Sequence, residues 1–333
     1  MSLIEASRRG LECASGGFCI DPMRRSELAL ITHAHADHAR RGSDRYIAVR
    51  DSVPILRTRL GPSRRIDAVD YGERIRLGDT VVSFHPAGHV LGSAQIRVER
   101  GDEVWVASGD FKRDPDPTCA PFEVVECDTF ITEATFALPI YRWPDTPIVA
   151  AEIFDWWHEN RRQQRPSVLF CYAFGKAQRV LAELLPLTDE RIFVHGAVEK
   201  LNVLYREAGV KMLPTETVNL RERRDYAGEL IIAPPGAAGT RWMRRFKSAS
   251  TGFCSGWMRV RGNRRRRGYD RGFVLSDHAD WPSLLRTIDD VKAQKILMTH
   301  GHADTLVRLL TEQGVDAREM PVRRDEPETD ASL

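Results

Sequence analysis

Six consecutive residues, HAHADH at positions 33–38, place four metal-binding side chains in one short segment. His33, His35, Asp37 and His38 follow the apolar run 28–31, which predicts a buried strand. Three imidazoles and a carboxylate at this spacing are hard to explain as core packing, because a buried aspartate needs a partner. A solvated polar loop would account for any one of them, but the four together are typical of a metal or catalytic site.

Length and composition fit a globular protein of more than one domain. The 333 residues exceed a single core, and contents of 42% hydrophobic and 29% charged residues are ordinary for soluble proteins. No apolar run has the length of a membrane span, and the N-terminal residues lack the features of a signal peptide. The six cysteines form no CxxC pair. We therefore expect a cytoplasmic protein with reduced thiols and no membrane partner.

The formal net charge of +2 conceals a strongly basic segment. Residues 241–271 contain eleven Lys and Arg residues against one acid, so the rest of the chain is net negative. Such a run is often only a solvated loop, but this asymmetry favours a polyanionic ligand.

Three more candidate ligands follow predicted strands. His89 comes after the strand 81–85, Asp110 ends a hairpin over 95–107, and His300 ends the strand 296–299. Loops at strand ends are where sites are commonly built. Seven nitrogen and oxygen ligands exceed the needs of one tetrahedral ion and favour two ions that share a carboxylate. Two such ions would hold a bridging hydroxide, which suits the hydrolysis of phosphate esters.

The pattern changes near residue 145. Helical stretches at 148–160, 176–185 and 198–208 alternate with apolar strands at 168–174, 192–194 and 230–232. This alternation predicts a parallel sheet that is covered on both faces.

The motifs together resemble those of the metallo-β-lactamase superfamily: HAHADH is followed by GH at 88–89, GD at 109–110 and TH at 299–300. The resemblance implies two divalent ions, with zinc expected and manganese or iron as alternatives. It implies that one ion is bound by His33, His35 and His89, the other by Asp37, His38 and His300, and that Asp110 bridges them.

Three further segments resemble the β-CASP nuclease branch of that superfamily: TEATF at 132–136, YAFGKAQR at 172–179 and SDHAD at 276–280. The gap of 190 residues between Asp110 and His300 leaves room for a whole inserted domain. The predicted fold is therefore α/β, a metallo-β-lactamase αβ/βα sandwich with an inserted α/β β-CASP domain. The sandwich is expected over 1–143 and 272–323, the inserted domain as a nucleic-acid clamp over 144–271, and a flexible tail over 324–333.

Within the branch, the segment SGWMR at 255–259 and the arginine run after it are most similar to bacterial ligase-associated DNA exonucleases. That resemblance implies a DNA exonuclease in DNA repair, with an ATP-dependent DNA ligase and a helicase as partners. His300 favours RNA instead, because RNA-directed relatives carry this histidine. A ribonuclease of the RNA 3′-end processing type is therefore the alternative.

The resemblance also implies catalytic roles. Asp37 would align the attacking hydroxide, and His278, oriented and kept charged by Glu133, would protonate the leaving oxygen. Phosphate contacts are expected from basic and small polar residues of the inserted domain: Lys176, Arg179, Ser255, Arg259, Arg261, Arg264, Arg265, Arg266 and Arg267.

Two other interpretations stay open at this point. A small-molecule metallohydrolase needs neither the inserted domain nor its basic run. A nucleic-acid-binding scaffold without activity would be expected to have lost metal ligands, and the set here is complete.

Overall fold

The computed structural model describes residues 2–219, 221, 224–260, 262, 268–301, 303–320 and 322. It divides into two compact units. The larger unit combines the chain up to Tyr141 with the segment from His278 onward, and the inserted unit spans Arg142–Asp277.

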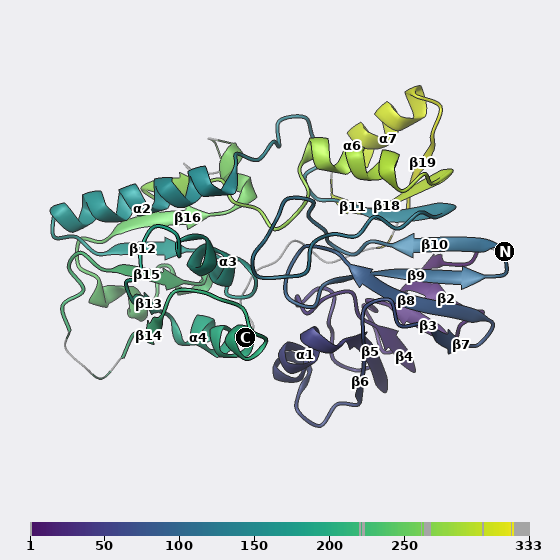
Figure 1. Ribbon diagram of the computed structural model, residues 1–333, viewed down its shortest axis with the longest axis horizontal. Helices are drawn as coiled ribbons and strands as arrows, with labels where there is room; N and C mark the ends of the chain where they lie inside the picture. The colour runs from purple at the N-terminus through teal and green to yellow at the C-terminus, as the bar shows by residue number, and fades with distance from the viewer. Residues whose placement is uncertain are drawn as a thin grey trace. The chain divides into compact units, whose positions relative to one another are not determined.

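Two sheets form the centre of the larger unit, within the described ranges (Figure 1). The first sheet has the order β1-β2-β3-β4-β5-β6, with β1 Glu5–Ser7, β2 Gly10–Cys13, β3 Phe18–Ile20, β4 Leu28–Leu30, β5 Arg45–Val49 and β6 Ile66–Val69. The second has the order β19-β18-β11-β10-β9-β8-β7, with β7 Ile75–Leu77, β8 Thr80–Pro86, β9 Ala94–Arg100, β10 Glu103–Ala107, β11 Thr129–Ala134, β18 Lys295–Gly301 and β19 Asp316–Glu319.

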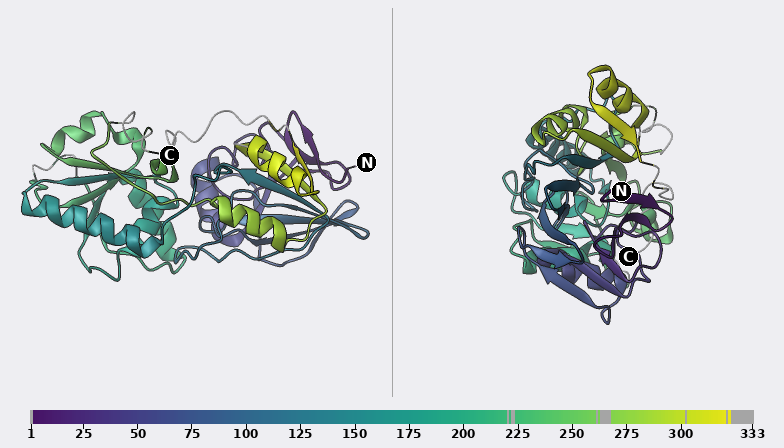
Figure 2. Two further views of the ribbon diagram at one scale, coloured as in Figure 1. Left: turned by 90° about the horizontal axis from the view of Figure 1, so that it is seen from above. Right: turned by 90° about the vertical axis from the view of Figure 1, so that its right-hand side faces the viewer.

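Both faces of the second sheet carry apolar side chains and are buried. One face shares a core with the first sheet, to which Leu30 and Phe84 contribute. The other face packs against α6 (Trp281–Asp290) and α7 (Ala303–Glu312), which lie over β11 and β18 (Figures 1 and 2). The short helices η1 (Arg50–Ser52) and α1 (Val53–Leu60) connect the parallel strands β5 and β6. This layering leaves the strand ends as the sites where polar loops can gather.

The inserted unit is built on a parallel sheet of order β14-β13-β15-β12-β16-β17, as the alternating pattern predicts. Its strands are β12 Ser167–Phe170, β13 Ile192–Val194, β14 Thr215–Thr217, β15 Leu230–Ala233, β16 Ser250–Cys254 and β17 Arg271–Phe273. Its helices are α2 Thr146–Arg162, α3 Lys176–Glu183, α4 Gly196–Glu207, η2 Pro235–Ala237, η3 Arg241–Arg245 and η4 Gly256–Arg259.

One expected boundary differs from the structure. The strand predicted to reopen the sandwich at residue 272 is β17, which pairs in parallel with β16 of the inserted unit. Its backbone hydrogen bonds therefore assign residues 271–277 to the inserted unit. The expected tail at 324–333 lies outside the described residues. Over the described ranges, none of the helices combines the length and the apolar character that crossing a membrane requires.

Candidate metal centre

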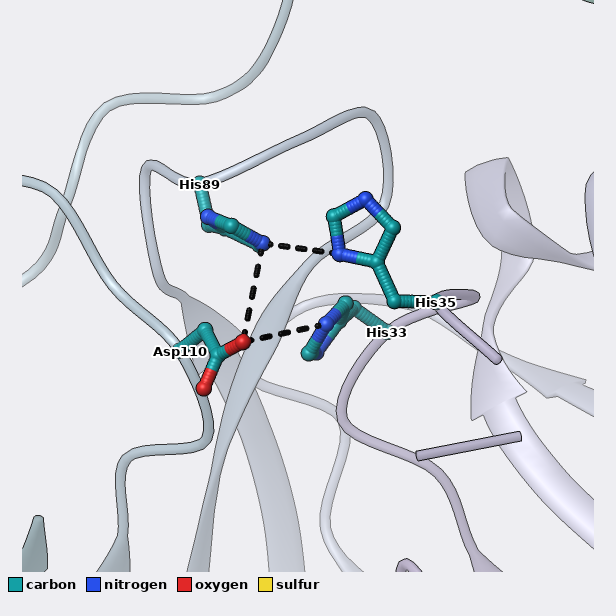
Figure 3. A group of neighbouring side chains, drawn as sticks. All are labelled: His33, His35, His89 and Asp110. Atoms are coloured by element: carbon teal, nitrogen blue, oxygen red, sulfur yellow. Dashed lines mark hydrogen bonds and ion pairs between the residues drawn. The ribbon is translucent and has the colours of Figure 1, made fainter. Parts of the chain in front are cut away.

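The carboxylate of Asp110 faces the histidine cluster, with His33 and His89 beside it (Figure 3). Its Oδ2 is 3.5 Å from Nε2 of His33, 3.3 Å from Nε2 of His38 and 3.9 Å from Nε2 of His89. Asp110 and these three histidines are at most 4% exposed. His35 completes the group, since its Nδ1 is 3.0 Å from Nε2 of His89.

Three segments that are distant in sequence meet here, and each of them follows a strand of the larger unit. His33 to His38 follow β4, His89 follows β8, and Asp110 follows β10. The loop that carries His89 is closed by Ser93, whose hydroxyl accepts the backbone N–H groups of His89 and Val90.

Asp21 supports the cluster from the end of β3. Its carboxylate accepts the Thr32 N–H at 2.8 Å and the Thr32 hydroxyl at 2.6 Å, and it is 2.7 Å from Nδ1 of His38. Asp21 is not among the site residues predicted from the sequence. The signal that could have identified it is a carboxylate at a strand end, as for Asp110.

These contacts fix the tautomers of two histidines. Because Nδ1 of His38 donates to Asp21, Nε2 is the ring nitrogen of His38 that faces Asp110. The Thr32 hydroxyl, which donates to Asp21, accepts from Nδ1 of His33 at 3.1 Å, so that Nε2 of His33 is an acceptor as well. Burial first, and then the neighbouring His38, lower the pKa of His33 well below its ordinary value, and the ring is neutral.

An acceptor therefore faces an acceptor where His33 meets Asp110. Among the residues that the structure describes, Nε2 of His33 is buried without a hydrogen-bond partner, and an oxygen of the Asp110 carboxylate lies 3.5 Å from it. A cation between them would turn this repulsion into attraction, and neutral imidazole with carboxylate is a donor set that zinc and manganese accept. The residues present thus fit a bound divalent metal. One atom from each of His33, His35, His89 and Asp110 lies within 4.8 Å of the others.

The second expected ligand group is only partly described. Asp37 Oδ2 is 3.3 Å from Nε2 of His38, and the Asp37 side chain is 24% exposed, which makes it the accessible carboxylate of the cluster. His300 lies in β18, but its side chain is outside the described residues.

An imidazole–carboxylate pair adjoins the histidine cluster. Nδ1 of His278 is 2.9 Å from Oε2 of Glu133, which is 1% exposed at the end of β11. The Phe111 N–H donates to Oε1 of the same carboxylate at 2.8 Å. Ligand atoms of Asp110, Glu133 and His278 lie within 4.8 Å of one another. The structure therefore brings the expected acid pair next to the expected bridging carboxylate.

Three of the expected phosphate contacts are buried. Lys176 is 3% exposed and its Nζ is 3.0 Å from Asp277, while Arg179 is 2% exposed and donates to the Ser276 carbonyl oxygen at 2.6 Å. Ser255 is 1% exposed and caps η4 by accepting the Trp257 N–H. Their polar partners lie within the inserted unit, and the expectation that these three residues follow a phosphate backbone does not match their burial.

Arg259 is exposed, as a phosphate contact requires. The other expected contacts, Arg261, Arg264, Arg265, Arg266 and Arg267, lie outside the described residues.

Comparisons with known proteins give relatives of two kinds. The chain is 31% identical over 92% of its length to a "Probable DNA ligase" of Opitutus terrae, of which it covers 30%. It is 25% identical over 54% of its length to "Endoribonuclease YSH1" of Gibberella zeae, of which it covers 25%. It is 23% identical over 48% of its length to an "RNase J-like protein" of Methanocaldococcus jannaschii, of which it covers 40%. The chain thus spans less than half of each of these relatives.

A solved structure has the same fold. It is the crystal structure of a protein of unknown function from Enterococcus faecalis V583, with a TM-score of 0.61 and 12% identity over 90% of this chain and 80% of the other. No protein-family model matches the chain.

Proposed function

We propose that this chain, which belongs to the β-CASP branch of the metallo-β-lactamase superfamily, is a metal-dependent nuclease that hydrolyses phosphodiester bonds in DNA. The observation that carries the proposal is the buried cluster of His33, His35, His89 and Asp110, with the His278–Glu133 pair beside it. Hydrolysis of a phosphodiester bond by this chemistry needs a group that binds metal and a group that donates a proton. Here both lie beside the carboxylate of Asp110.

The metal ions would be held by His33, His35 and His89 on one side and by Asp37, His38 and His300 on the other, with Asp110 between them. Bound divalent ions in such a site supply positive charge that stabilises a phosphodiester transition state. We assign them as zinc, with manganese or iron as alternatives.

The residues of the chain supply the remaining steps. Asp37, the accessible carboxylate of the cluster, would orient the attacking water. Glu133 binds Nδ1 of His278, so that Nε2 is the ring atom that can transfer a proton to the leaving oxygen. The carboxylate also stabilises the imidazolium, because a buried negative charge favours the protonated ring.

We assign the larger unit to the metallo-β-lactamase sandwich and the inserted unit to the β-CASP domain that clamps the nucleic acid. The exposed side chain of Arg259 fits such a clamp. Phosphate contacts by arginines would give salt-sensitive, sequence-tolerant binding.

DNA is the favoured polymer because the relative matched over 92% of the chain is named a probable DNA ligase. That name also supports a role in DNA repair beside an ATP-dependent DNA ligase, in which the nuclease removes nucleotides from an end. The ribonuclease alternative is supported by the names of the endoribonuclease and RNase J-like relatives, which match shorter stretches.

A matched cleavage assay tests the proposal. Single-stranded DNA, duplex DNA and RNA of one sequence, labelled at either end, would be incubated with the protein and Zn²⁺ or Mn²⁺. We expect stepwise shortening of DNA, which is lost in Asp37→Ala and kept in the surface variant Asp102→Ala. Cleavage of RNA alone would favour the ribonuclease, and no cleavage of any polymer with either metal would contradict a nuclease.

A further inference from the structure

Phe111, next to the central carboxylate of Asp110, connects the two members of the acid pair through its backbone. Its N–H donates to Oε1 of Glu133 at 2.8 Å, and its carbonyl oxygen accepts the Ala279 N–H at 2.6 Å. Ala279 directly follows His278 in the chain. One buried residue therefore sets both the carboxylate and the loop that carries the imidazole.

Arg113 attaches the same segment to α6, the helix that follows the His278 loop. It donates to Oγ1 of Thr287 at 3.0 Å and to Oδ2 of Asp290 at 2.8 Å. Its guanidinium also lies 4.9 Å from the centre of the Phe122 ring. The Arg113 side chain is 12% exposed, so these are partly desolvated contacts and stronger than a surface ion pair.

The start of α6 is held as firmly as its end. Asp280 caps it by accepting the Ser283 N–H at 3.0 Å, and the Trp281 N–H donates to the carbonyl oxygen of Tyr141. The segment 110–113 and the segment 278–290 are thus joined at two places, Phe111 to Ala279 and Arg113 to the last turn of α6. Two attachments fix the orientation of α6 as well as its position, whereas a single hydrogen bond would leave the helix able to rotate.

We propose that Arg113 is a positioning residue for proton transfer by His278. The proposal rests on the proposed function, since it assigns Arg113 to the orientation of its general acid. Arg113 fixes α6 relative to Phe111, and so fixes the distance and angle between His278 and Glu133. A misplacement of about 1 Å in such a group costs up to about 100-fold in rate.

The leaving group separates this role from a purely structural one. An alkoxide of a nucleic acid needs a proton as it departs, whereas p-nitrophenolate departs readily without one. A variant with a misplaced acid therefore loses activity on an oligonucleotide but keeps it on bis(p-nitrophenyl) phosphate. A variant with a damaged metal centre or fold loses both.

The experiment compares kcat on a single-stranded DNA oligonucleotide and on bis(p-nitrophenyl) phosphate, with Mn²⁺ present. For Arg113→Gln we expect a loss of about 10-fold or more on the oligonucleotide and less than about 3-fold on the activated ester. Arg113→Lys should recover part of the activity on the oligonucleotide that Arg113→Gln loses. Asp290→Asn removes the same ion pair from its more exposed side and should show the same selectivity if Arg113→Gln folds poorly.

Two reference variants complete the design. His278→Ala should show the selective loss in full. Arg74→Gln, which breaks a two-bond arginine–carboxylate pair with Glu99 of β9, should change neither rate. Equal losses on both substrates, or no loss, in Arg113→Gln and Asp290→Asn would overturn the positioning role while wild-type cleavage upheld the proposed function. A wild-type protein that hydrolyses neither substrate would overturn both.

Discussion

Asp21 shows how a residue outside the ligand set can determine the chemistry of the cluster. It is 3% exposed and its carboxylate orders Thr32 and His38, and through the Thr32 hydroxyl also His33. Outer partners of this kind orient ligand lone pairs and raise ligand basicity. The metal affinity should therefore depend on Asp21 although Asp21 is not assigned as a ligand.

Asp21→Asn should weaken metal binding by about 10- to 100-fold, because an amide cannot accept all the donors that now face the carboxylate. Competition with a fluorescent chelator measures the affinity. Asp44→Asn, at an exposed pair with Arg25, is the matched control and should bind metal as the wild type does. Unchanged affinity in Asp21→Asn would show that the tautomers are set by other contacts.

Two buried thiols, those of Cys127 and Cys254, should not react with alkylating reagents in the native protein. Burial raises the pKa of Cys127 and of Cys254 to about 12 each, so that almost no thiolate exists at pH 8. Iodoacetamide should label the partly exposed Cys119 first and leave these two unmodified until urea unfolds the protein. Mass spectrometry of the labelled peptides measures this order, and fast labelling of Cys254 in the native protein would contradict its burial.

The loop between β8 and β9 depends on a glycine with no room for a side chain. Gly88 has a φ of +71°, and a Cβ there would lie 2.3 Å from the carbonyl oxygen of Lys112. The close approach matters because the same contact brings the Asp110 loop against the residue before His89. Gly101, with a φ of +60° and nothing within 4 Å of a Cβ, provides a direct comparison.

Gly101→Ala should lower the free energy of unfolding only by the backbone strain of the alanine, about 1–2 kcal/mol. Gly88→Ala should lower the free energy of unfolding by roughly 3 kcal/mol or more, since the buried backbone at Lys112 must shift as well. Urea unfolding of the two variants measures the difference. Equal stability losses would mean that the loop relaxes without strain.

The first turn of α3 contains a buried ion pair where sequence reasoning expected phosphate contacts. Burial is the largest single influence and opposes the charge on Lys176, but Asp277, Tyr172 and Cys254 together outweigh it, and the pKa of Lys176 lies above its ordinary value. Tyr172 adds its ring face at 5.1 Å from Nζ. The lysine is therefore charged and committed to the interior of the inserted unit.

Lys176→Met should destabilise the protein by about 3–5 kcal/mol, because it leaves the Asp277 carboxylate buried without its cation. Arg259→Gln, at an exposed position, should leave stability within about 0.5 kcal/mol and reduce the salt dependence of DNA binding by about one ion. Thermal unfolding and binding isotherms at several salt concentrations test both. A stable Lys176→Met variant with weakened DNA binding would restore the phosphate-contact hypothesis.

Across the whole chain, local patterns predicted the structure well where hydrophobic periodicity and strand-end polar residues coincide. The hairpin around Gly101, the parallel sheet of the inserted unit and the meeting of His33, His89 and Asp110 follow from such patterns. The same patterns did not predict the short strands. Each of β1, β2 and β3 has three or four residues, too few to show an alternation of apolar and polar side chains.

The burial of Lys176 and the boundary at β17 could not be predicted for a different reason. Each depends on a partner far away in sequence, Asp277 in one case and β16 in the other. A charged residue near a helix start looks the same in sequence whether it faces solvent or a buried carboxylate. Tertiary pairing decides such cases, and only the structure supplies it.

Metal removal and restoration is the most direct test of the metal-centre assignment. The protein would be stripped with a chelator, returned to increasing amounts of Zn²⁺ or Mn²⁺, and assayed for both bound metal and DNA cleavage, with Asp110→Asn beside the wild type. We predict that cleavage disappears on stripping, returns as about two ions bind per chain, and stays absent in Asp110→Asn. Cleavage that persists without metal, or an Asp110→Asn variant that binds metal and cleaves DNA normally, would contradict the assignment.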